Sequence, residues 1–468
     1  MFETFKTILG LFVVLPFLAG VGLYLSIKLR WLQLHKLPLA FRLITRKSSG
    51  KESISSFGAL SAVLGGNLGT GNISGIAVAI ATGGPGSLFW MWIMALFGAV
   101  IKFAGCFLGL RFRQMSTRGG YVGGPMYYFH YGLNRPFLAK LFCVLTLITA
   151  VTVGGFVQIN SITLPFFEFG VHPAILGLSM AVFVGYVILG GLKRFAKISM
   201  LIVPLMAVGY LLACFFIMIR NLDAVVPAIK LIVVSAFDFS SLLGGVAGYS
   251  IMSALKSGFE RGLFATDSGV GLAPILHAPV TDRSPGMDIA ISQGLISMIS
   301  PIIVMIVCTL TGIVLLVTGV WQSTELQSTT MCVEAFRVGF DIFEAGHLVT
   351  VTLFFFAFTT ILTWSYCADR AVEYLFGEER IKYFQYIFIA LIPVGAFAHV
   401  NIVWSIADVS MSLMMALNVI GVVWLSPIVI KETRAFFYPK RSLPGEVIMQ
   451  QEPKSAAICK AGDEKSVR

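Results

Sequence analysis

Apolar runs long enough to cross a lipid bilayer recur along almost the whole chain, and they limit what it can fold into. A helix needs about 20 apolar residues to span the hydrocarbon core. Hydrophobic residues make up 57% of the chain and charged residues only 12%, which is far from the average of soluble domains. The sequence therefore predicts an all-α polytopic membrane protein with about 11 transmembrane helices. The spans are expected at about 8–26, 55–82, 86–112, 137–165, 174–192, 198–219, 242–278, 290–319, 348–367, 383–400 and 404–430.

Basic residues gather in three of the connections between these spans and again after the last span. Such clusters favour the cytoplasmic side of a membrane. The net charge of +11 therefore indicates orientation in a bilayer, and no nucleic-acid partner is expected. An odd number of spans then places the N-terminus outside and the C-terminus in the cytoplasm. The clusters are Lys28, Arg30, Lys36, Arg42, Arg46, Lys47 and Lys51; Arg111, Arg113 and Arg118; Lys193, Arg194 and Lys197; and Lys431, Arg434, Lys440 and Arg441.

Two of the apolar segments are interrupted by glycines and polar residues. The first reads GGNLGTGNISGIA over Gly65–Ala77, and the second carries four glycines within 258–271. Four spans follow each break, so the chain divides into matching halves at about 55–219 and 242–430. Five spans in each half give the halves opposite orientations, which predicts inverted repeats with a binding site near the midplane where the breaks meet. The alternative interpretation is a coincidental placement of glycines.

The first break offers two kinds of backbone group. Opening the helix at Gly69, Thr70, Gly71 and Asn72 exposes N–H groups at the start of the next half-helix, where they can bind a carboxylate. Carbonyl groups freed at the end of the preceding half-helix, near Gly65 and Leu68, are oxygen donors for a small cation. One unwound stretch can therefore hold both charges that a cation-coupled transporter of zwitterions must bring together. The alternative is a glycine surface for helix packing.

The same stretch resembles the signature of the sodium:alanine (alanine or glycine:cation) symporter family. The resemblance covers nearly the whole chain except the tail, and it implies a LeuT-type fold: ten core helices in two inverted five-helix repeats, preceded by one extra N-terminal span. Residues 1–440 would form a single transmembrane transporter domain, with 441–468 as a polar cytoplasmic tail. The motifs that carry it are GTGNISGIAVAIATGGPGSLFWMW at Gly69–Trp92, YVGGPMYYF at Tyr121–Phe129, QINS at Gln158–Ser161, RGLF at Arg261–Phe264, FAFTTILTWSY at Phe356–Tyr366 and SIADVSMSLMMALNVIG at Ser405–Gly421.

The resemblance also implies a set of binding residues. For the substrate these are Thr70, Gly71 and Asn72 at the break, Gln158, and the pocket walls Phe264 and Trp364. For a sodium ion they are the hydroxyl groups of Thr359 and Thr360 with backbone carbonyls at Gly65, Leu68 and Phe356. Without the family, Gln158 would be an ordinary inter-helix hydrogen bonder and Trp364 a lipid-facing aromatic. Thr359 and Thr360 would bond to carbonyls of their own helix.

The chain departs from the family pattern after Phe264. Where the family usually has Ser-Asn-Glu-Ala-Gly, this chain has Ala265-Thr266-Asp267-Ser268-Gly269, which keeps the acidic position with a shorter side chain and loses an asparagine. Selectivity or coupling can differ from the family norm for this reason.

Together these features predict a symporter in the cytoplasmic membrane of a prokaryote. It would import a small neutral amino acid, alanine or glycine, by alternating access, with Na⁺ as coupling ion and no organic cofactor. The nearest alternative is a proton-coupled amino-acid permease of the same fold, with Asp267 or His277 titrating. A membrane enzyme is disfavoured because the sequence has no metal-ligand spacing, no placed nucleophile and no phosphate-binding motif. A passive channel is disfavoured because no repeated filter sequence is present.

Overall fold

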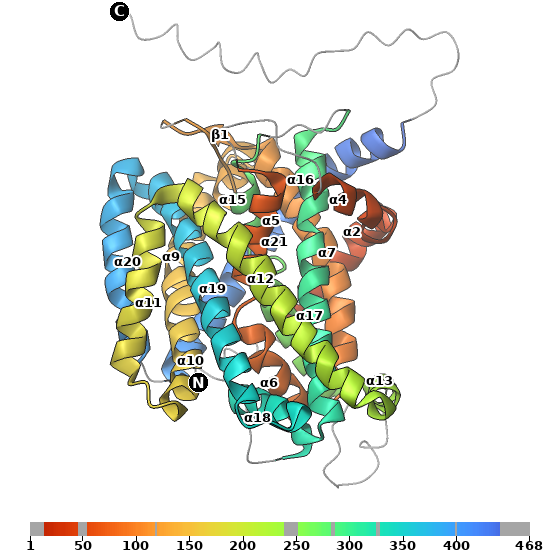
Figure 1. Cartoon of the computed structure of the whole chain (residues 1–468). Coiled ribbons are helices and arrows are strands. Elements are labelled where there is room, and N and C mark those ends of the chain that lie inside the picture. Colours follow the sequence, from red (N-terminus) through yellow and green to blue (C-terminus); the bar gives the residue numbers. More distant parts are fainter. Residues whose placement is uncertain are drawn as a thin grey trace, which may run out of the picture.

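Apolar helices make up most of the computed structural model, which describes residues 14–44, 54–117, 119–237, 251–281, 286–323, 328–397 and 400–439 (Figure 1). The predicted polar tail and several of the basic residues lie outside these ranges. Six of the described helices are long and apolar enough to cross a membrane: Ser87–Arg111, Pro136–Glu168, Gly191–Arg220, Ile289–Val317, Ala345–Phe376 and Ser405–Phe437. Shorter apolar helices are Leu15–Lys28, Ser74–Gly83 and Pro173–Ile188.

The first half of the chain begins with short N-terminal helices and contains the first break. Its elements are α2 (Leu15–Lys28), α3 (Leu32–His35), α4 (Leu37–Ile44), α5 (Ser56–Asn67), η2 (Thr70–Asn72), α6 (Ser74–Gly83), α7 (Ser87–Arg111), β1 (Gln114–Met115), β2 (Tyr121–Val122), α8 (Pro125–Tyr127), η3 (Tyr128–Gly132), α9 (Pro136–Thr149), η4 (Ala150–Phe156), α10 (Val157–Glu168), α11 (Pro173–Ile188), α12 (Gly191–Arg220) and α13 (Leu222–Ser235). The two strands form an antiparallel pair.

The second half repeats the pattern of an interrupted helix followed by long helices. Its elements are α14 (Ile251–Thr266), α15 (Leu272–His277), α16 (Ile289–Ser297), α17 (Ile299–Val317), η6 (Val320–Gln322), α18 (Ser328–Phe340), α19 (Ala345–Phe376), η7 (Glu378–Arg380), α20 (Ile381–Gly395) and α21 (Val400–Phe437).

The predicted first break is present, and the second is shorter than the glycines suggested. The second break covers only the residues between Thr266 and Leu272, with positive φ at Asp267, Gly269 and Gly271. Gly258 and Gly262 lie inside α14 instead. A Cβ at Gly258 would collide with the start of α7, so this glycine is needed for close packing, not for unwinding. The prediction that both glycines belong to the break was therefore wrong.

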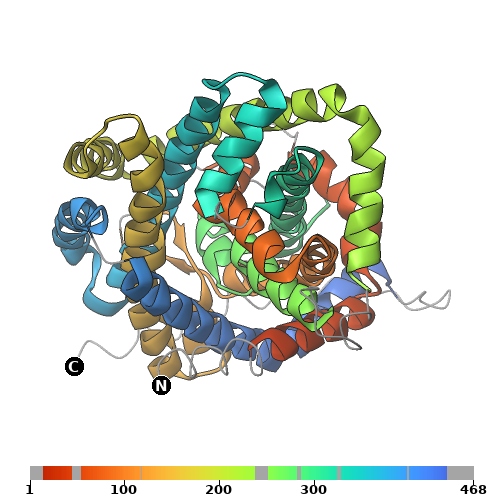
Figure 2. The same ribbon diagram turned by 90° about the horizontal axis from the view of Figure 1, so that it is seen from below.

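The two interrupted helices lie near the centre of the molecule, where α14 packs against α6 and α7 (Figure 2). In the same view, α13 and α21 run along the outside. α5 packs against α12 and α19. The outer face of α12 exposes Leu201, Leu205 and Leu212, as a helix surrounded by lipid does. The long apolar helices thus surround and position two irregular segments that would be unstable on their own in lipid.

Gly154 in the π-helical turn η4 allows α19 to pack closely against this segment. A Cβ built on Gly154 would overlap the Cβ and Cγ atoms of Trp364, whereas one built on Gly209 of α12 would meet nothing within 4 Å. Because the Trp364 Cβ is fixed to the α19 backbone, Gly154→Ala should destabilise the protein by about 1–3 kcal/mol through overpacking. Thermal unfolding in detergent should show a lower melting temperature for Gly154→Ala and no loss for the control Gly209→Ala. Equal melting temperatures would contradict this packing.

Candidate functional site

The first break is held open by residues from three other helices. Helix α5 ends at Asn67, the backbone is extended at Gly69, and α6 begins at Ser74. A Cβ on Gly69 would lie 3.0 Å from the Thr360 hydroxyl and 3.3 Å from Oε1 of Gln158, and a Cβ on Gly71 would lie 3.0 Å from the Phe264 ring. Glycine allows these side chains to approach the backbone closely, and a Cβ at either position would force its neighbour to shift by a few tenths of an ångström.

Gln158 binds the N-terminal end of the second half-helix. Its Oε1 accepts hydrogen bonds from the Thr70 backbone N–H at 3.3 Å and from the Thr70 hydroxyl at 3.1 Å. Its Nε2 donates to the carbonyl of Val153 at 3.1 Å, within the π-helical turn that precedes Gln158. Such turns often occur at functional sites. An oxygen acceptor thus lies against the N–H group that the sequence assigned to a substrate carboxylate.

Two asparagines connect the breaks to one another. Asn72 Nδ2 donates to the backbone carbonyl of Asn67, and Asn67 Nδ2 donates to the carbonyl of Thr266 at 3.2 Å. Thr266 is the last residue of α14, so one side chain spans from the first break to the second. The Asn72 side chain is therefore occupied within the protein, and its direct contact with a substrate stays a prediction.

The two predicted pocket aromatics are placed differently. Phe264 lies two residues before the end of α14 and faces Gly71 of the first break. Trp364 is buried and packs on Gly154, so the alternative that it faces lipid is wrong. Their expected role as walls of a substrate pocket stays a prediction.

The predicted sodium ligands meet where α5 packs against α19. The Thr360 hydroxyl donates to the Gly65 carbonyl at 3.0 Å, across the interface. The Thr359 hydroxyl bonds to the carbonyls of Phe355 and Phe356 in its own helix, at 3.0 and 3.2 Å. The alternative that these hydroxyls bond to their own helix thus holds for Thr359 and fails for Thr360.

Thr363 is a further hydroxyl at this interface, and sequence reasoning missed it. It lies one turn after Thr359 and donates to the carbonyls of Ala62 and Thr359, both at 3.0 Å. Its i+4 spacing from Thr359 was the available signal. Leu68 is buried at the end of the same half-helix, and its carbonyl role stays a prediction. The donors are neutral oxygens, and in the described part of the chain no three His, Cys, Asp or Glu side chains gather as a metal site would need.

The second break carries buried charges and a polar connection to α21. Asp267 is buried, and its Oδ2 has no hydrogen-bond partner among the described residues. Lys102 of α7 is also buried and donates to the Ser300 hydroxyl at 2.9 Å. Asn418 Nδ2 donates to the carbonyl of Gly269 at 2.6 Å, and its Oδ1 accepts from the Tyr128 hydroxyl. Sequence reasoning found Asp267 but missed Lys102, Asn418 and Tyr128.

His277 ends α15 and is buried. Its Nδ1 lies 2.8 Å from Oε1 of Gln293, and Gln293 Nε2 donates to the Ser56 hydroxyl at 2.8 Å. These contacts connect α15 and α16 to the start of α5, so His277 takes part in the packing of these helices.

Comparisons with known proteins agree with the arrangement of these elements. A family model described as the sodium:alanine symporter family matches residues 1–448. A transporter of Haemophilus influenzae is 42% identical over 424 residues, covering 90% of this chain and 92% of its own. The sodium/alanine symporter AgcS of Methanococcus maripaludis is 37% identical over 434 residues, covering 90% and 93%. A solved manganese transporter of Eremococcus coleocola has a similar fold, with a TM-score of 0.52, 14% identity and coverage of 86% of this chain and 92% of that chain.

The hydrogen bond from Asn67 to Thr266 predicts that the two breaks lose order together. Asn67→Ala removes the donor and leaves the buried Thr266 carbonyl without it, which should cost about 1–3 kcal/mol. Hydrogen exchange measured by mass spectrometry should therefore become faster in peptides covering both 65–73 and 264–271. The control Asn221→Ala removes an amide that bonds only within its own helix region and should change neither peptide. Faster exchange at the first break alone would contradict the connection.

Proposed function

The chain belongs to the sodium:alanine symporter family, and from this we propose that it is a sodium-coupled symporter that imports alanine or glycine by alternating access. It is a multi-pass membrane protein of a transporter family. The observation that carries the proposal is the pair of interactions on one unwound stretch: Thr70 with Gln158, and Gly65 with Thr360. The first supports a carboxylate site and the second a sodium site. A pocket walled by Phe264 and Trp364, as the family resemblance implies, would accept alanine or glycine and exclude larger side chains.

In this proposal the substrate carboxylate takes over the donors that Gln158 now occupies. The Thr70 N–H and hydroxyl both point to Gln158 Oε1. A carboxylate at this position would bond to the same two donors, and the Gln158 amide would turn to present its Nε2 group to the ligand. The Thr70 donors would then bond to a charged carboxylate in place of the neutral Gln158 amide oxygen. Hydrogen bonds to a charged acceptor are stronger.

Sodium would act on the other end of the same stretch. An ion between the Gly65, Leu68 and Phe356 carbonyls and the hydroxyls of Thr359 and Thr360 would hold α5 against α19. This would stabilise the open backbone at Gly69 and so favour the geometry that binds the carboxylate. Each ligand then raises the affinity of the other, as thermodynamic linkage requires.

The proposed architecture is that of two inverted five-helix repeats, about 55–219 and 242–430, after one extra N-terminal span. The single transmembrane domain would cover 1–440, in the cytoplasmic membrane, with the N-terminus outside and the tail 441–468 in the cytoplasm. The similar order of elements around the two breaks supports this division, because α5 to α12 and α14 to α21 both begin with an interrupted helix.

A proton-coupled permease of the same fold is the second candidate. It is favoured by one observation, the buried carboxyl group of Asp267 at the second break with its Oδ2 unbonded among the described residues. A group in this position can bind a proton and lose it again as the break changes shape. Such a transporter would work without sodium.

Uptake into proteoliposomes decides between the two candidates. Labelled alanine should accumulate against its gradient when sodium is high outside only, and it should equilibrate without accumulation when sodium is equal on both sides. A pH gradient without sodium should not drive accumulation. Equal uptake with and without a sodium gradient would exclude sodium coupling, and accumulation driven by pH alone would favour the proton-coupled alternative.

Two substitutions should separate the substrate site from the sodium site. Gln158→Leu removes a polar partner of a charged ligand and should weaken alanine binding about tenfold, or about 1.4 kcal/mol, while sodium affinity changes little. Thr360→Val keeps the side-chain shape but removes the hydroxyl, so it should raise the sodium concentration needed for half-maximal uptake. The control Thr163→Val removes a hydroxyl that bonds only to its own helix and should change neither value. Unchanged alanine affinity in Gln158→Leu would remove Gln158 from the site.

A further inference from the structure

A cavity of about 300 Å³ lies between α19, α20 and the start of α12. It is lined on one side by polar residues of α19 and on the other by apolar residues of α11 and α12. A volume of this size holds a small ion together with several water molecules. The residues named for the substrate and sodium sites do not line it.

Three polar atoms of α19 residues that line this cavity have no hydrogen-bond partner within the described structure: Ser365 Oγ, Tyr366 Oη and Asp369 Oδ1. All three residues are more than nine-tenths buried, with Asp369 only 6% exposed. Buried polar groups are almost always bonded, so three orphan oxygens around one cavity require an explanation. A carboxylate oxygen can only accept, and it therefore needs a donor or a cation.

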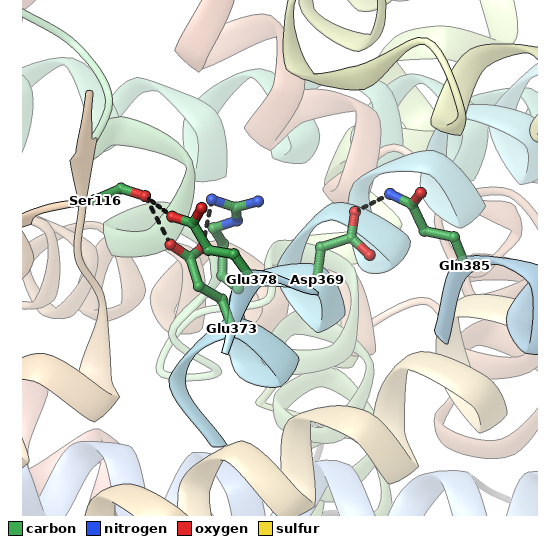
Figure 3. A network of polar contacts seen from close by, with 6 residues as sticks. Ser116, Asp369, Glu373, Glu378 and Gln385 are labelled. Atoms are coloured by element: carbon green, nitrogen blue, oxygen red, sulfur yellow. Dashed lines mark hydrogen bonds and ion pairs between the residues drawn. The ribbon is translucent and has the colours of Figure 1, made fainter. Parts of the chain in front are cut away.

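Asp369 has a partner for only one of its two carboxylate oxygens. Its Oδ2 accepts a hydrogen bond from Gln385 Nε2 of α20 at 2.7 Å, and Figure 3 shows this bond beside the second, unbonded oxygen. Burying a charged carboxylate without a counter-charge is costly. One neutral amide donor does not remove that cost.

Two basic residues also line the cavity, Arg370 and the exposed Lys382, and Arg370 is already paired. Arg370 Nη1 lies 2.5 Å from Glu373 Oε2. The Ser116 hydroxyl lies 2.9 Å from Glu373 Oε1 and also contacts the Glu378 carboxylate (Figure 3). Glu373 thus contacts both Arg370 and Ser116, and Glu378 contacts Ser116. The three carboxylates of Asp369, Glu373 and Glu378 outnumber the two basic side chains of Arg370 and Lys382, so the local charge favours a cation over an anion in the cavity.

The Tyr366 ring is held in place by two neighbouring side chains. It stacks on Phe195 of α12 with ring centres 5.4 Å apart, and the Arg370 guanidinium lies over the ring at 5.2 Å. The hydroxyl of a ring fixed in this way has a defined position. This hydroxyl, the Ser365 hydroxyl and the Asp369 carboxylate provide three oxygen ligands within about one and a half turns of α19.

We infer that Asp369, Ser365 and Tyr366 form a second binding site for a small monovalent cation, and that the ion is sodium. Carboxylate and hydroxyl oxygens are hard ligands, and water in the cavity completes the coordination. Gln385 orients the carboxylate by holding Oδ2, which leaves Oδ1 for the ion. The ion supplies the positive charge that the buried carboxylate lacks.

The site lies on the same continuous helix as the proposed sodium site at Thr359 and Thr360. Ser365 and Asp369 follow Thr360 by five and nine residues, or about 8 and 14 Å along the helix axis. In the proposed topology this direction leads toward the cytoplasm. A sodium ion released from the first site would meet the second before reaching the cytoplasmic end of α19. The inference rests on the proposed function in two respects only: that the ion is sodium, and that the second site lies on the path by which sodium leaves the first.

Equilibrium binding of radioactive sodium to the purified full-length protein in detergent tests the inference, without alanine present. Asp369→Asn keeps the shape of the side chain but removes its charge, and it should bind one sodium ion fewer per chain than the wild type. In a Thr360→Val background, which weakens the first site, the remaining sodium binding should disappear when Asp369→Asn is added. This double variant reports on the second site even if the proposed coupling at the first site is wrong.

Three further variants separate a binding role from a structural one. Tyr366→Phe keeps the ring stacking and removes one oxygen, so sodium affinity should fall several-fold while the number of ions at saturation is unchanged. Lys382→Met removes an exposed competing charge at the rim, and sodium should bind at least as tightly. The control Asp223→Asn, an exposed carboxylate on α13, should change nothing.

Three outcomes would overturn the inference. The first is an Asp369→Asn protein that unfolds at the wild-type temperature and binds as many sodium ions with the same affinity. The second is loss of alanine binding in Asp369→Asn with unchanged sodium binding, which would place an ammonium group in the cavity in place of sodium. Weaker sodium binding in Lys382→Met would likewise show that Lys382, and not an ion, organises the cavity.

Discussion

Backbone groups cannot be left unbonded inside a membrane, and this constraint shapes the structure around both breaks. Each unsatisfied group in lipid costs several kcal/mol. Helix termini leave N–H and C=O groups without intrahelical partners, and here distant side chains take their place. The pairs are Gln158 with the Thr70 N–H, Thr360 with the Gly65 carbonyl, Asn72 with the Asn67 carbonyl, Asn67 with the Thr266 carbonyl and Asn418 with the Gly269 carbonyl. Helices α10, α19 and α21 supply three of these partners, and the other two, Asn67 and Asn72, lie at the first break itself.

The same constraint places the proposed binding positions of sodium and of the substrate carboxylate close to one another. The Thr360 hydroxyl and Gln158 Oε1 both lie close to Gly69, at 3.0 and 3.3 Å from where its Cβ would be. A shift of the backbone at Gly69 must therefore affect the sodium side and the carboxylate side together. In the proposed function no long-range pathway is needed for coupling, because this one unwound residue lies beside a side chain of each proposed site. The connection through Asn67 extends this effect to the second break.

The sequence predicted the local features well because they follow from residue type. Glycines and asparagines in an apolar segment indicate a broken helix, and the first break is present where they predicted it. The ligand roles of Thr359 and Thr360 came from the family resemblance and stay predictions. Partners far apart in the chain were predicted only where a family motif named them, as for Gln158. Lys102, Asn418 and Asp369 were missed because a single polar residue in an apolar helix does not reveal which surface it faces. Gly258 and Gly262 were misassigned because glycine serves both unwinding and close packing, and only the position of α7 distinguishes the two.

The departure from the family pattern after Phe264 can now be interpreted physically. Thr266 Oγ1 donates to the carbonyl of Gly262 in its own helix and lies 2.9 Å from the Ser268 hydroxyl, and Ser268 packs against Gly98 of α7. Ala265 is buried. These side chains are thus occupied with each other and with α7, while Phe264 faces the first break. We therefore expect the departure to alter how α14 and the second break pack against α7, including the surroundings of Asp267, and to leave substrate size selection to Phe264 and Gly71.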